Sequence, residues 1–388
     1  MTPAARVQAA IECLDLILAG QAAEQVLTGW ARRSRFAGSK DRAAVRDHVF
    51  DALRCRRSFA ALGGAETGRG LMLGALRSAG IAPETMFTGD GYGPASLTDA
   101  ELDAGRDPDP GAEEGDVPDW IWPLFVAALG DEAKASAAAL RHRAPVHLRV
   151  NAARSTPEAA MEALRNDGIE TCPHAGSPHA LEIRDGARKL RQSEAYLTGL
   201  VELQDAASQA VVMALPLDAG MRVLDYCAGG GGKSLALAAQ PGVEVFAHDA
   251  APERLRDLDE RAARAGASVE ILSGDDVAQS GPFDVVLCDV PCSGSGAWRR
   301  APDGKWRLTP ERLEELRAVQ AGILDDVMPL VAPGGIVAYA TCSLLSVENE
   351  AQIEAFLFRN SGWHCTFQKS WPVTGGTDGF FSAHLTRD

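Results

Sequence analysis

The sequence predicts an α/β protein in which a parallel sheet with helices on both faces follows a small α+β module and an N-terminal helical region. Two observations carry this prediction. After Gln204, short apolar runs rich in β-branched residues alternate with amphipathic segments, which is the pattern of a parallel sheet. Before that point, apolar residues recur at helical spacing, and a segment rich in acidic residues, Pro and Gly interrupts them.

The C-terminal part holds the elements of the predicted sheet. Its strands are expected at residues 222–226, 243–248, 269–272, 284–288 and 335–340. Its helices are expected at about 232–240, 252–266, 310–331 and 347–359. Because parallel strands are joined through helices, their carboxyl ends should meet at one edge of the sheet, where ligands bind in such folds.

The middle of the chain predicts a smaller unit. A helix over about residues 119–141 precedes a short strand at 146–150, and a second strand is expected at 180–183. Between them, Ser155 or Thr156 can cap a helix that Gly168 ends. The region therefore reads as an α+β module.

Charge is distributed unevenly along the chain. The formal net charge is −15, yet residues 1–80 hold twelve basic and seven acidic side chains, and residues 99–119 hold nine acidic and one basic. A basic end of this kind is compatible with contacts to nucleic-acid phosphates, although a solvated helix face gives the same pattern. We therefore divide the chain into a helical domain (1–81), an acidic linker (82–118), the α+β module (119–200) and the sheet domain (201–388).

The sequence shows no sign of export or of a metal site. The apolar stretch from Ile11 to Ala19 is broken by Glu12 and Asp15, so it is neither a signal peptide nor a membrane span. The eight cysteines include no Cys-x-x-Cys pair, so neither a zinc site nor a disulfide framework is indicated. We expect a cytoplasmic, monomeric protein with reduced thiols.

A glycine-rich loop, Asp225-Tyr-Cys-Ala-Gly-Gly-Gly-Gly-Lys-Ser234, follows the first strand of the sheet. A phosphate-binding P-loop would need glycine where Cys227 stands, and a dinucleotide fingerprint would need Gly or Ala at position 234. S-adenosylmethionine carries no phosphate and tolerates a looser pattern. Asp249 ends the second strand, where it can bind ribose hydroxyls, and Asp275 and Asp276 follow the third strand, near an adenine.

Two cysteines follow neighbouring strands of the same sheet. Cys292 stands in Asp289-Val-Pro-Cys, and Cys342 in Thr-Cys-Ser. Either cysteine alone reads as a core thiol, but two at adjoining strand ends indicate chemistry on a pyrimidine. A thiolate that adds to carbon 6 of cytosine makes carbon 5 nucleophilic enough to accept a methyl group. Asp289 could stabilise the adduct at cytosine N3.

At these residues the sequence resembles the Sun/Nop family of RNA cytosine-5 methyltransferases, especially the bacterial ribosomal RNA methyltransferase B group. The resemblance runs from about Pro118 to the C-terminus. It includes Arg149-Val-Asn, Cys227-Ala-Gly-Gly-Gly-Gly-Lys, Asp289-Val-Pro-Cys, Lys305-Trp, Thr341-Cys-Ser with Glu348-Asn-Glu, and Asp378-Gly-Phe-Phe.

The resemblance implies a class I methyltransferase (Rossmann-like) domain, a small RNA-recognition-like module and a NusB-like RNA-binding domain. It implies Cys342 as nucleophile, Cys292 as the thiol that helps to remove the carbon-5 proton and release the product, and Lys233 facing the target base. The implied contacts to S-adenosylmethionine are Cys227, Ala228, Gly229, Gly230, Gly231, Gly232, Lys233, Asp249, Asp275, Asp276 and Asp289. The implied partner is RNA, with ribosomal RNA as the expected target.

The chain departs from the family pattern at two positions of the loop: Gly230 replaces the usual proline, and Ser234 the usual threonine. Four other interpretations stay open, and one of them is a paralogue that acts on a non-ribosomal RNA. A DNA cytosine-5 methyltransferase would use the Pro-Cys cysteine and lack Cys342, and a small-molecule or protein methyltransferase would leave the paired cysteines without a task. A noncatalytic RNA-binding assembly factor would not need Cys292, Cys342, Asp249 or Asp289.

Overall fold

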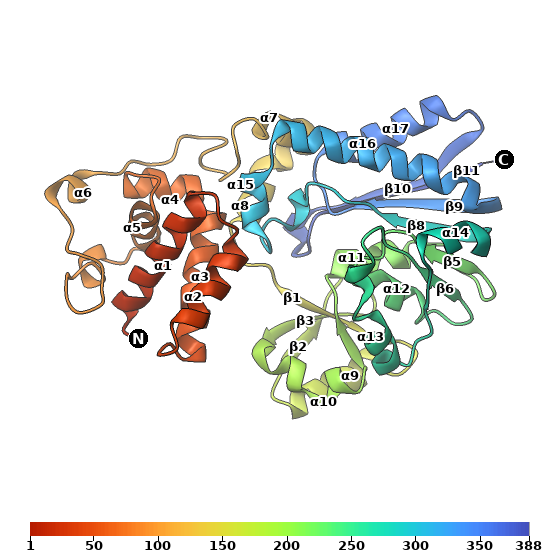
Figure 1. Ribbon diagram of the computed structural model, residues 1–388, viewed down its shortest axis with the longest axis horizontal. Helices are drawn as coiled ribbons and strands as arrows, with labels where there is room; N and C mark the ends of the chain where they lie inside the picture. The colour runs from red at the N-terminus through yellow and green to blue at the C-terminus, as the bar shows by residue number, and fades with distance from the viewer. Residues whose placement is uncertain (388) are drawn as a thin grey trace. The chain divides into compact units, whose positions relative to one another are not determined.

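The computed structural model describes residues 1–387, which form two compact units (Figure 1). Unit 1 consists of Met1–Arg143 together with Trp298–Leu308, and unit 2 of Ala144–Ala297 together with the chain from Thr309 onward. Within residues 1–387, no helix combines the length and apolar character needed to cross a bilayer.

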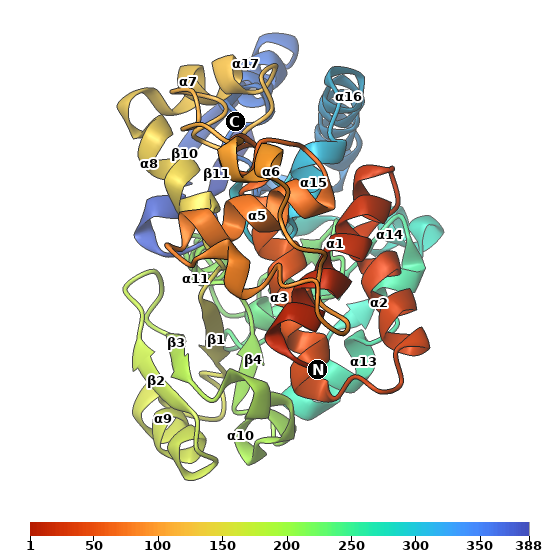
Figure 2. The same cartoon turned by 90° about the vertical axis from the view of Figure 1, so that its left-hand side faces the viewer.

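Unit 1 is helical and packs around one apolar core. Thr2 caps its first helix, and Pro3 occupies the first turn, where its missing N–H costs nothing. Val45 and Val49 are fully buried one helical turn apart, as their spacing predicts. The helices are α1 (Pro3–Leu18), α2 (Ala23–Arg33), α3 (Ser39–Arg54), α4 (Arg56–Gly63), α5 (Gly68–Ser78), α6 (Asp99–Asp103), α7 (Trp122–Leu129), α8 (Ala133–Leu140) and α15 (Pro302–Arg307). The first three helices and α5 enclose the core (Figure 2).

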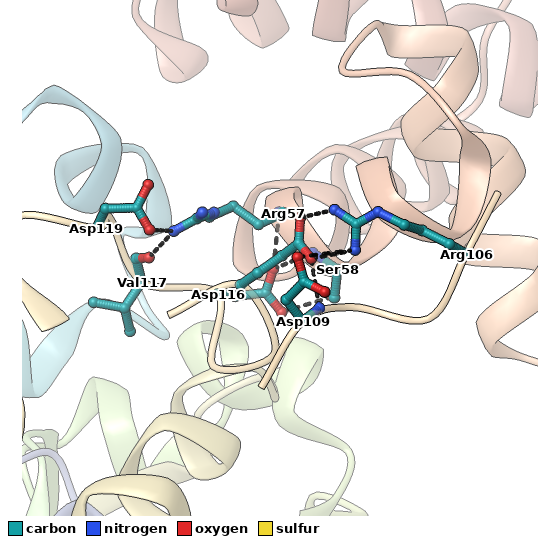
Figure 3. A network of polar contacts seen from close by, with 8 residues as sticks. Arg57, Ser58, Arg106, Asp109, Asp116, Val117 and Asp119 are labelled. Atoms are coloured by element: carbon teal, nitrogen blue, oxygen red, sulfur yellow. Dashed lines mark hydrogen bonds and ion pairs between the residues drawn. The ribbon is translucent and has the colours of Figure 1, made fainter. Parts of the chain in front are cut away.

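The predicted acidic linker is attached to this helical unit. The carboxylate of Asp116, fully buried, accepts hydrogen bonds from the backbone N–H groups of Arg57 and Ser58, both at 2.9 Å, and from the Ser58 hydroxyl at 2.7 Å (Figure 3). Arg141 Nε lies 2.9 Å from the same carboxylate. Arg106 pairs with Glu113. Several of the acidic residues in this segment are therefore partners of arginines.

Residues 298–308 complete unit 1 from far along the chain. Lys305 Nζ donates to the Arg54 carbonyl at 3.1 Å, and Trp306 Nε1 donates to the Leu53 carbonyl at 2.7 Å. In return, Arg54 Nε donates to the Arg299 carbonyl at 2.7 Å. The end of α3 and this segment thus satisfy each other's buried backbone and side-chain polar groups.

Unit 2 begins with a four-stranded antiparallel sheet in the order β2-β3-β1-β4. Its strands are β1 (Val146–Val150), β2 (Glu170–Pro173), β3 (Ala180–Asp185) and β4 (Val201–Leu203). The helices α9 (Pro157–Asn166) and α10 (Glu194–Leu197) cover it, and Thr156 caps α9. The expected strands at 146–150 and 180–183 are present as β1 and β3, with β2 and β4 in addition. The single helix expected over about residues 119–141 is instead two helices of unit 1, α7 and α8, because Gly130 (φ 53°) interrupts the helical backbone.

The large sheet of unit 2 has seven strands in the order β10-β11-β9-β8-β5-β6-β7. Its strands are β5 (Arg222–Asp225), β6 (Glu244–Ala247), β7 (Glu270–Ile271), β8 (Phe283–Asp289), β9 (Val331–Thr341), β10 (Trp363–Trp371) and β11 (Phe380–Arg387). The first five are parallel, and β10 and β11 are antiparallel. The predicted parallel sheet is therefore extended at one edge by an antiparallel hairpin.

Helices cover both faces of this sheet (Figure 1). Alternation along each strand separates the two cores: Leu224, Val286 and Tyr339 pack toward α16 and α17, whereas Val223 and Val285 pack toward α11 and α12. The helices are α11 (Ala206–Met213), α12 (Gly232–Leu237), α13 (Leu258–Ala265), α14 (Gly274–Ser280), α16 (Pro310–Val327) and α17 (Glu350–Arg359). The predicted helices are present, although α13 and α17 are preceded by separate 3-10 turns.

Candidate active site

The glycine-rich loop joins β5 to α12 at the carboxyl edge of the large sheet. Gly229 (φ 56°) and Gly231 (φ 76°) adopt left-handed conformations that favour glycine. A Cβ at position 231 would lie 2.3 Å from Leu258 Cδ1, so a side chain there would displace α13. A Cβ at Gly230 would meet only Arg261 Nη1, at 3.5 Å. Position 230 therefore has room for a Cβ, and its φ lies outside the left-handed region, so neither feature requires glycine there.

Two carboxyl groups, at the ends of β5 and β6, hold this loop in place. Asp249 Oδ2 accepts from the Gly229 N–H at 2.8 Å, and Asp249 Oδ1 accepts from the Ala251 N–H at 2.9 Å. Asp225 Oδ2 accepts from the Ser234 hydroxyl at 2.7 Å, so serine supplies the hydroxyl that a threonine would offer here. Burial raises the pKa of Asp225 to about 7. The loop is held from both sides by acids at the ends of β5 and β6.

The other predicted cofactor residues follow the same edge. Ala228 N–H donates to the His248 carbonyl at 2.9 Å, and burial raises the pKa of Cys227 far above the usual thiol range. Asp275 and Asp276 lie exposed in the first turn of α14, where Asp276 accepts from the Ser273 hydroxyl at 2.6 Å. The structure brings residues 227–233 and Asp249 together, and it places Asp275 and Asp276 one loop further on.

The Arg-Val-Asn sequence of β1 supports the loop from the small module. Arg149 Nη1 donates to the Gly232 carbonyl at 2.8 Å and to Gln204 Oε1 at 2.6 Å. Asn151 Nδ2 donates to the Ala265 carbonyl at 2.8 Å. The sequence predicted no role for Arg149 or Asn151 beyond the family resemblance. They connect the small sheet to both ends of the α12–α13 region.

Cys292 and Cys342 meet beyond the ends of β8 and β9. Their sulfur atoms lie 3.4 Å apart, and both side chains are partly exposed. The loop after Cys292 is tight, because Gly296 donates to the Cys342 carbonyl at 2.9 Å and accepts from the Gly379 N–H at 2.9 Å. A Cβ at Gly296 would lie 2.1 Å from the Gly379 carbonyl oxygen. Adjacent strands and a glycine contact therefore bring the two thiols into contact.

Lys233 and Asp289 form an ion pair between the glycine loop and the cysteine pair. Lys233 Nζ lies 2.6 Å from Asp289 Oδ2 and 4.9 Å from the centre of the Phe380 ring. Burial opposes the ammonium charge of Lys233, but Asp289 outweighs it and raises the pKa of the lysine, with a smaller contribution from Cys342. A fixed cation thus stands beside the predicted nucleophile.

A buried carboxylate lies behind the two cysteines, and the sequence predicted no role for it beyond its place in the Glu348-Asn-Glu part of the family resemblance. Glu348, fully buried in the 3-10 turn Ser346–Glu348, accepts through Oε1 from the Ser293 N–H at 2.8 Å and from Gln320 Nε2 at 3.0 Å. Its Oε2 accepts from the hydroxyls of Ser293 and Ser343, both at 2.5 Å. In the sequence, the only indication of this position was the Glu348-Asn-Glu motif that follows Thr-Cys-Ser.

Comparison with known proteins identifies these features as those of one family. Residues 212–386 match the family model described as 16S rRNA methyltransferase RsmB/F, and residues 117–188 match the model of its ferredoxin-like domain. The chain belongs to the RsmB/F methyltransferase family. This membership confirms the resemblance to the ribosomal RNA methyltransferase B group, and it agrees with the fold class that strand and helix spacing predicted.

Proteins with similar sequences are named as members of the same family. The ribosomal RNA small subunit methyltransferase B of Salmonella arizonae is 35% identical over 259 residues, which cover 63% of this chain and 60% of that protein. Its counterpart in Pectobacterium atrosepticum is 33% identical over 285 residues, covering 70% and 66%. The chain therefore spans less than two thirds of the length of these relatives.

Solved structures show the same fold. The crystal structure of PH0851 superimposes with a TM-score of 0.75 at 22% identity and covers 100% of this chain and 99% of its own. That of NSun6 from Pyrococcus horikoshii with SFG gives a TM-score of 0.61 at 17% identity and covers 70% and 98%. At this level of identity the likeness establishes the fold alone.

The loop residues fit S-adenosylmethionine, the cofactor on which the RsmB/F family depends. Position 231 excludes any side chain, which keeps the loop backbone uncovered. Among the described residues, the buried Asp225 Oδ1 lacks a hydrogen-bond partner, so the site retains an acceptor. The residues that would hold the cofactor are 227–233 and Asp249, and the methyl group it carries would be the one transferred.

Proposed function

We propose that this chain transfers a methyl group from S-adenosylmethionine to carbon 5 of a cytosine in RNA, with ribosomal RNA as the substrate. The observation that carries the proposal is the 3.4 Å separation of the Cys292 and Cys342 sulfurs beside the Lys233–Asp289 pair. Paired thiols at the edge of a methyltransferase sheet suit a reaction that proceeds through a covalent adduct.

The two cysteines have consecutive roles in this proposal. The Cys342 thiolate adds to carbon 6, which places the electron pair on carbon 5, where the methyl group is accepted. In this proposal the charge of Lys233, which Asp289 holds in place, favours the thiolate, and Asp289 stabilises the adduct at cytosine N3. Cys292 acts after transfer, when the carbon-5 proton leaves and the bond between Cys342 and carbon 6 breaks.

Unit 1 supports RNA as the partner. A hollow of about 530 Å³ between α2 and α3 is lined in part by Arg32, Arg35, Arg42 and Arg46. Arg46 pairs with Glu24, but within residues 1–387 no ion pair is present for the other three arginines. The neighbouring Phe36 is 76% exposed. Unpaired arginines beside an exposed aromatic ring are the combination that binds single-stranded RNA.

The experiment that tests the proposal separates the two cysteines. The protein is incubated with S-adenosylmethionine labelled in the methyl group and with ribosomal RNA, and covalent complexes are separated by denaturing electrophoresis. Cys342→Ala should abolish both methylation and the complex. Cys292→Ala should methylate once and remain attached to the RNA, because release fails.

The matched control is Cys288→Ala, which removes a fully buried thiol from β8. It should methylate with normal turnover after some loss of packing stability. A covalent complex with Cys342→Ala and none with Cys292→Ala would reverse the two roles and favour the scheme of DNA cytosine-5 methyltransferases. No methylation by the unaltered chain on any RNA would leave the noncatalytic assembly factor as the better reading.

A further inference from the structure

One carboxylate links the two cysteine loops. The hydrogen bonds of Glu348 reach Ser293, which directly follows Cys292, and Ser343, which directly follows Cys342. A third residue, Ser295, reinforces the link, because its hydroxyl lies 3.0 Å from that of Ser343 and accepts from the Leu344 N–H at 2.8 Å. The separation of the two sulfurs therefore depends on a network centred on Glu348.

The charge of Glu348 is not neutralised by a cation. In the part of the chain that the structure describes, no ion pair involves Glu348, and the donors that it accepts from are an N–H, an amide and two hydroxyls. Accepting through both oxygens is the role of an ionised carboxylate. Burial makes such a charge costly unless every oxygen is bonded, as it is here.

The two sulfurs have different electrostatic surroundings. Two groups oppose a negative charge on the sulfur of Cys292, namely Cys342 at the end of β9 and Glu348, and the Gly294 N–H acts weakly in the opposite direction. The hydrogen bond with Cys342, then burial, then these charges raise the pKa of Cys292. The cation of the site, Lys233, interacts instead with Cys342.

We propose that Glu348 is a positioning residue for the cysteine pair, holding the two thiols in contact and keeping Cys292 protonated beside the Cys342 thiolate. The proposal rests on the proposed function for its catalytic meaning, but its geometry and its charge effect can be measured without RNA.

This assignment changes how Cys292 helps to release the product. In the release step, water takes the carbon-5 proton, the double bond between carbons 5 and 6 re-forms, and the bond from carbon 6 to Cys342 breaks with its electron pair going to sulfur. A protonated Cys292 at 3.4 Å donates a hydrogen bond to that departing sulfur. Cys292 therefore stabilises the leaving group and does not itself remove the carbon-5 proton.

The charge effect is tested with Glu348→Gln, which keeps the shape of the side chain and removes its charge. The pH dependence of alkylation by iodoacetamide is followed separately for Cys292 and Cys342 by mass spectrometry of their peptides. We expect the midpoint for Cys292 to fall by about one pH unit, since a neighbouring like charge has been removed. Glu350→Gln, which removes a charge two residues further on, should leave it unchanged.

The geometric effect is tested with Glu348→Ala, which removes all four hydrogen bonds. Diamide accepts two electrons and two protons from a thiol pair, and in the unaltered protein it should join Cys292 and Cys342 rapidly. Glu348→Ala should slow this disulfide formation at least tenfold. Circular dichroism checks that each variant folds. If Glu348→Ala does not fold, Ser343→Ala takes its place. That substitution removes one of the four hydrogen bonds of Glu348 and should also slow disulfide formation.

An unchanged alkylation midpoint for Cys292 in folded Glu348→Gln would overturn the charge role, and an unchanged rate of disulfide formation in Glu348→Ala or Ser343→Ala would overturn the positioning role. If both effects appear but the chain methylates no RNA, the proposed function fails and the role of Glu348 stands. If the chain methylates RNA and neither effect appears, this inference alone fails.

Discussion

Lys305 in unit 1 and Lys233 in unit 2 are both buried, and their surroundings are opposite. Lys305 donates to a backbone carbonyl and lies over the Trp306 ring, and burial lowers its pKa to about 8. Lys233 contacts a carboxylate at 2.6 Å, and its pKa is raised. Burial thus favours the neutral form of Lys305, whereas Lys233 is held charged beside two partly exposed thiols.

This contrast shows that a displaced pKa does not by itself identify a functional site. Around Lys305, burial also raises the pKa of Cys55 to about 11 and that of Asp116. Yet Cys55 only donates to the Arg141 carbonyl, and Asp116 pairs with the Arg141 guanidinium. In unit 2 the buried charges surround thiols that are partly exposed. The cluster in unit 2 differs from the cluster around Lys305 because its sulfur atoms are accessible and a charged lysine lies beside them.

The largest expected effect comes from replacing each lysine with methionine. Lys233→Met should lower kcat for RNA methylation by about 10²–10³-fold, because a preorganised charge at the reacting centre is lost. Lys305→Met should methylate normally, because its side chain lies in the core of unit 1. Initial rates at saturating S-adenosylmethionine measure both. Equal losses in the two variants would show that the contrast between the lysines is wrong.

The next effect concerns stability and pH. The pKa of Lys305 is about 8 in the folded chain and lies near 10.4 in an unfolded one, so the cost of its buried charge is present below pH 8 and is relieved as the pH rises toward 10. Between these values the free energy of unfolding should gain about 2–3 kcal/mol relative to Lys305→Met. Urea unfolding of both proteins from pH 7 to 10 measures the difference. Parallel curves would contradict the assigned pKa.

The smallest effect tests the surface of unit 1. Replacing Arg32, Arg35 and Arg42 with Gln should reduce the slope of log affinity for RNA against log salt by about 2, since each phosphate contact contributes about 0.7. Affinity for S-adenosylmethionine should not change. Arg312→Gln, which removes an arginine already paired with Glu315 on α16, serves as the control. An unaltered slope in the triple variant would assign the hollow to another partner.

The sequence allowed the carboxyl edge of the sheet to be predicted in some detail. Cys292 and Cys342 follow the ends of β8 and β9, which pair in parallel, so regular alternation of strands and helices was enough to place the two sulfurs together. The glycine loop and Asp249 follow β5 and β6 by the same rule. The residues that follow each strand end in the sequence therefore predict which side chains form the site.

Other features depend on contacts that spacing does not reveal. The strand β10 was not predicted because one of its faces is exposed and carries polar residues such as His364 and Gln368. The composition of the acidic segment predicted a linker. In the structure, however, Asp116 accepts a hydrogen bond from Ser58 and forms an ion pair with Arg141, both distant in sequence. The domain boundaries at residues 81, 118 and 200 remain predictions.

The discontinuity of unit 1 affects how the chain folds during synthesis. The helices up to Arg143 leave the ribosome before the segment Trp298–Leu308 exists, although that segment supplies Lys305 and Trp306 to the end of α3. At about 5–20 residues per second, the helical unit waits on the order of ten to thirty seconds for its last piece. During that interval the Leu53 and Arg54 carbonyls lack these donors, so the end of α3 reaches its final set of contacts only after most of unit 2 has been synthesised.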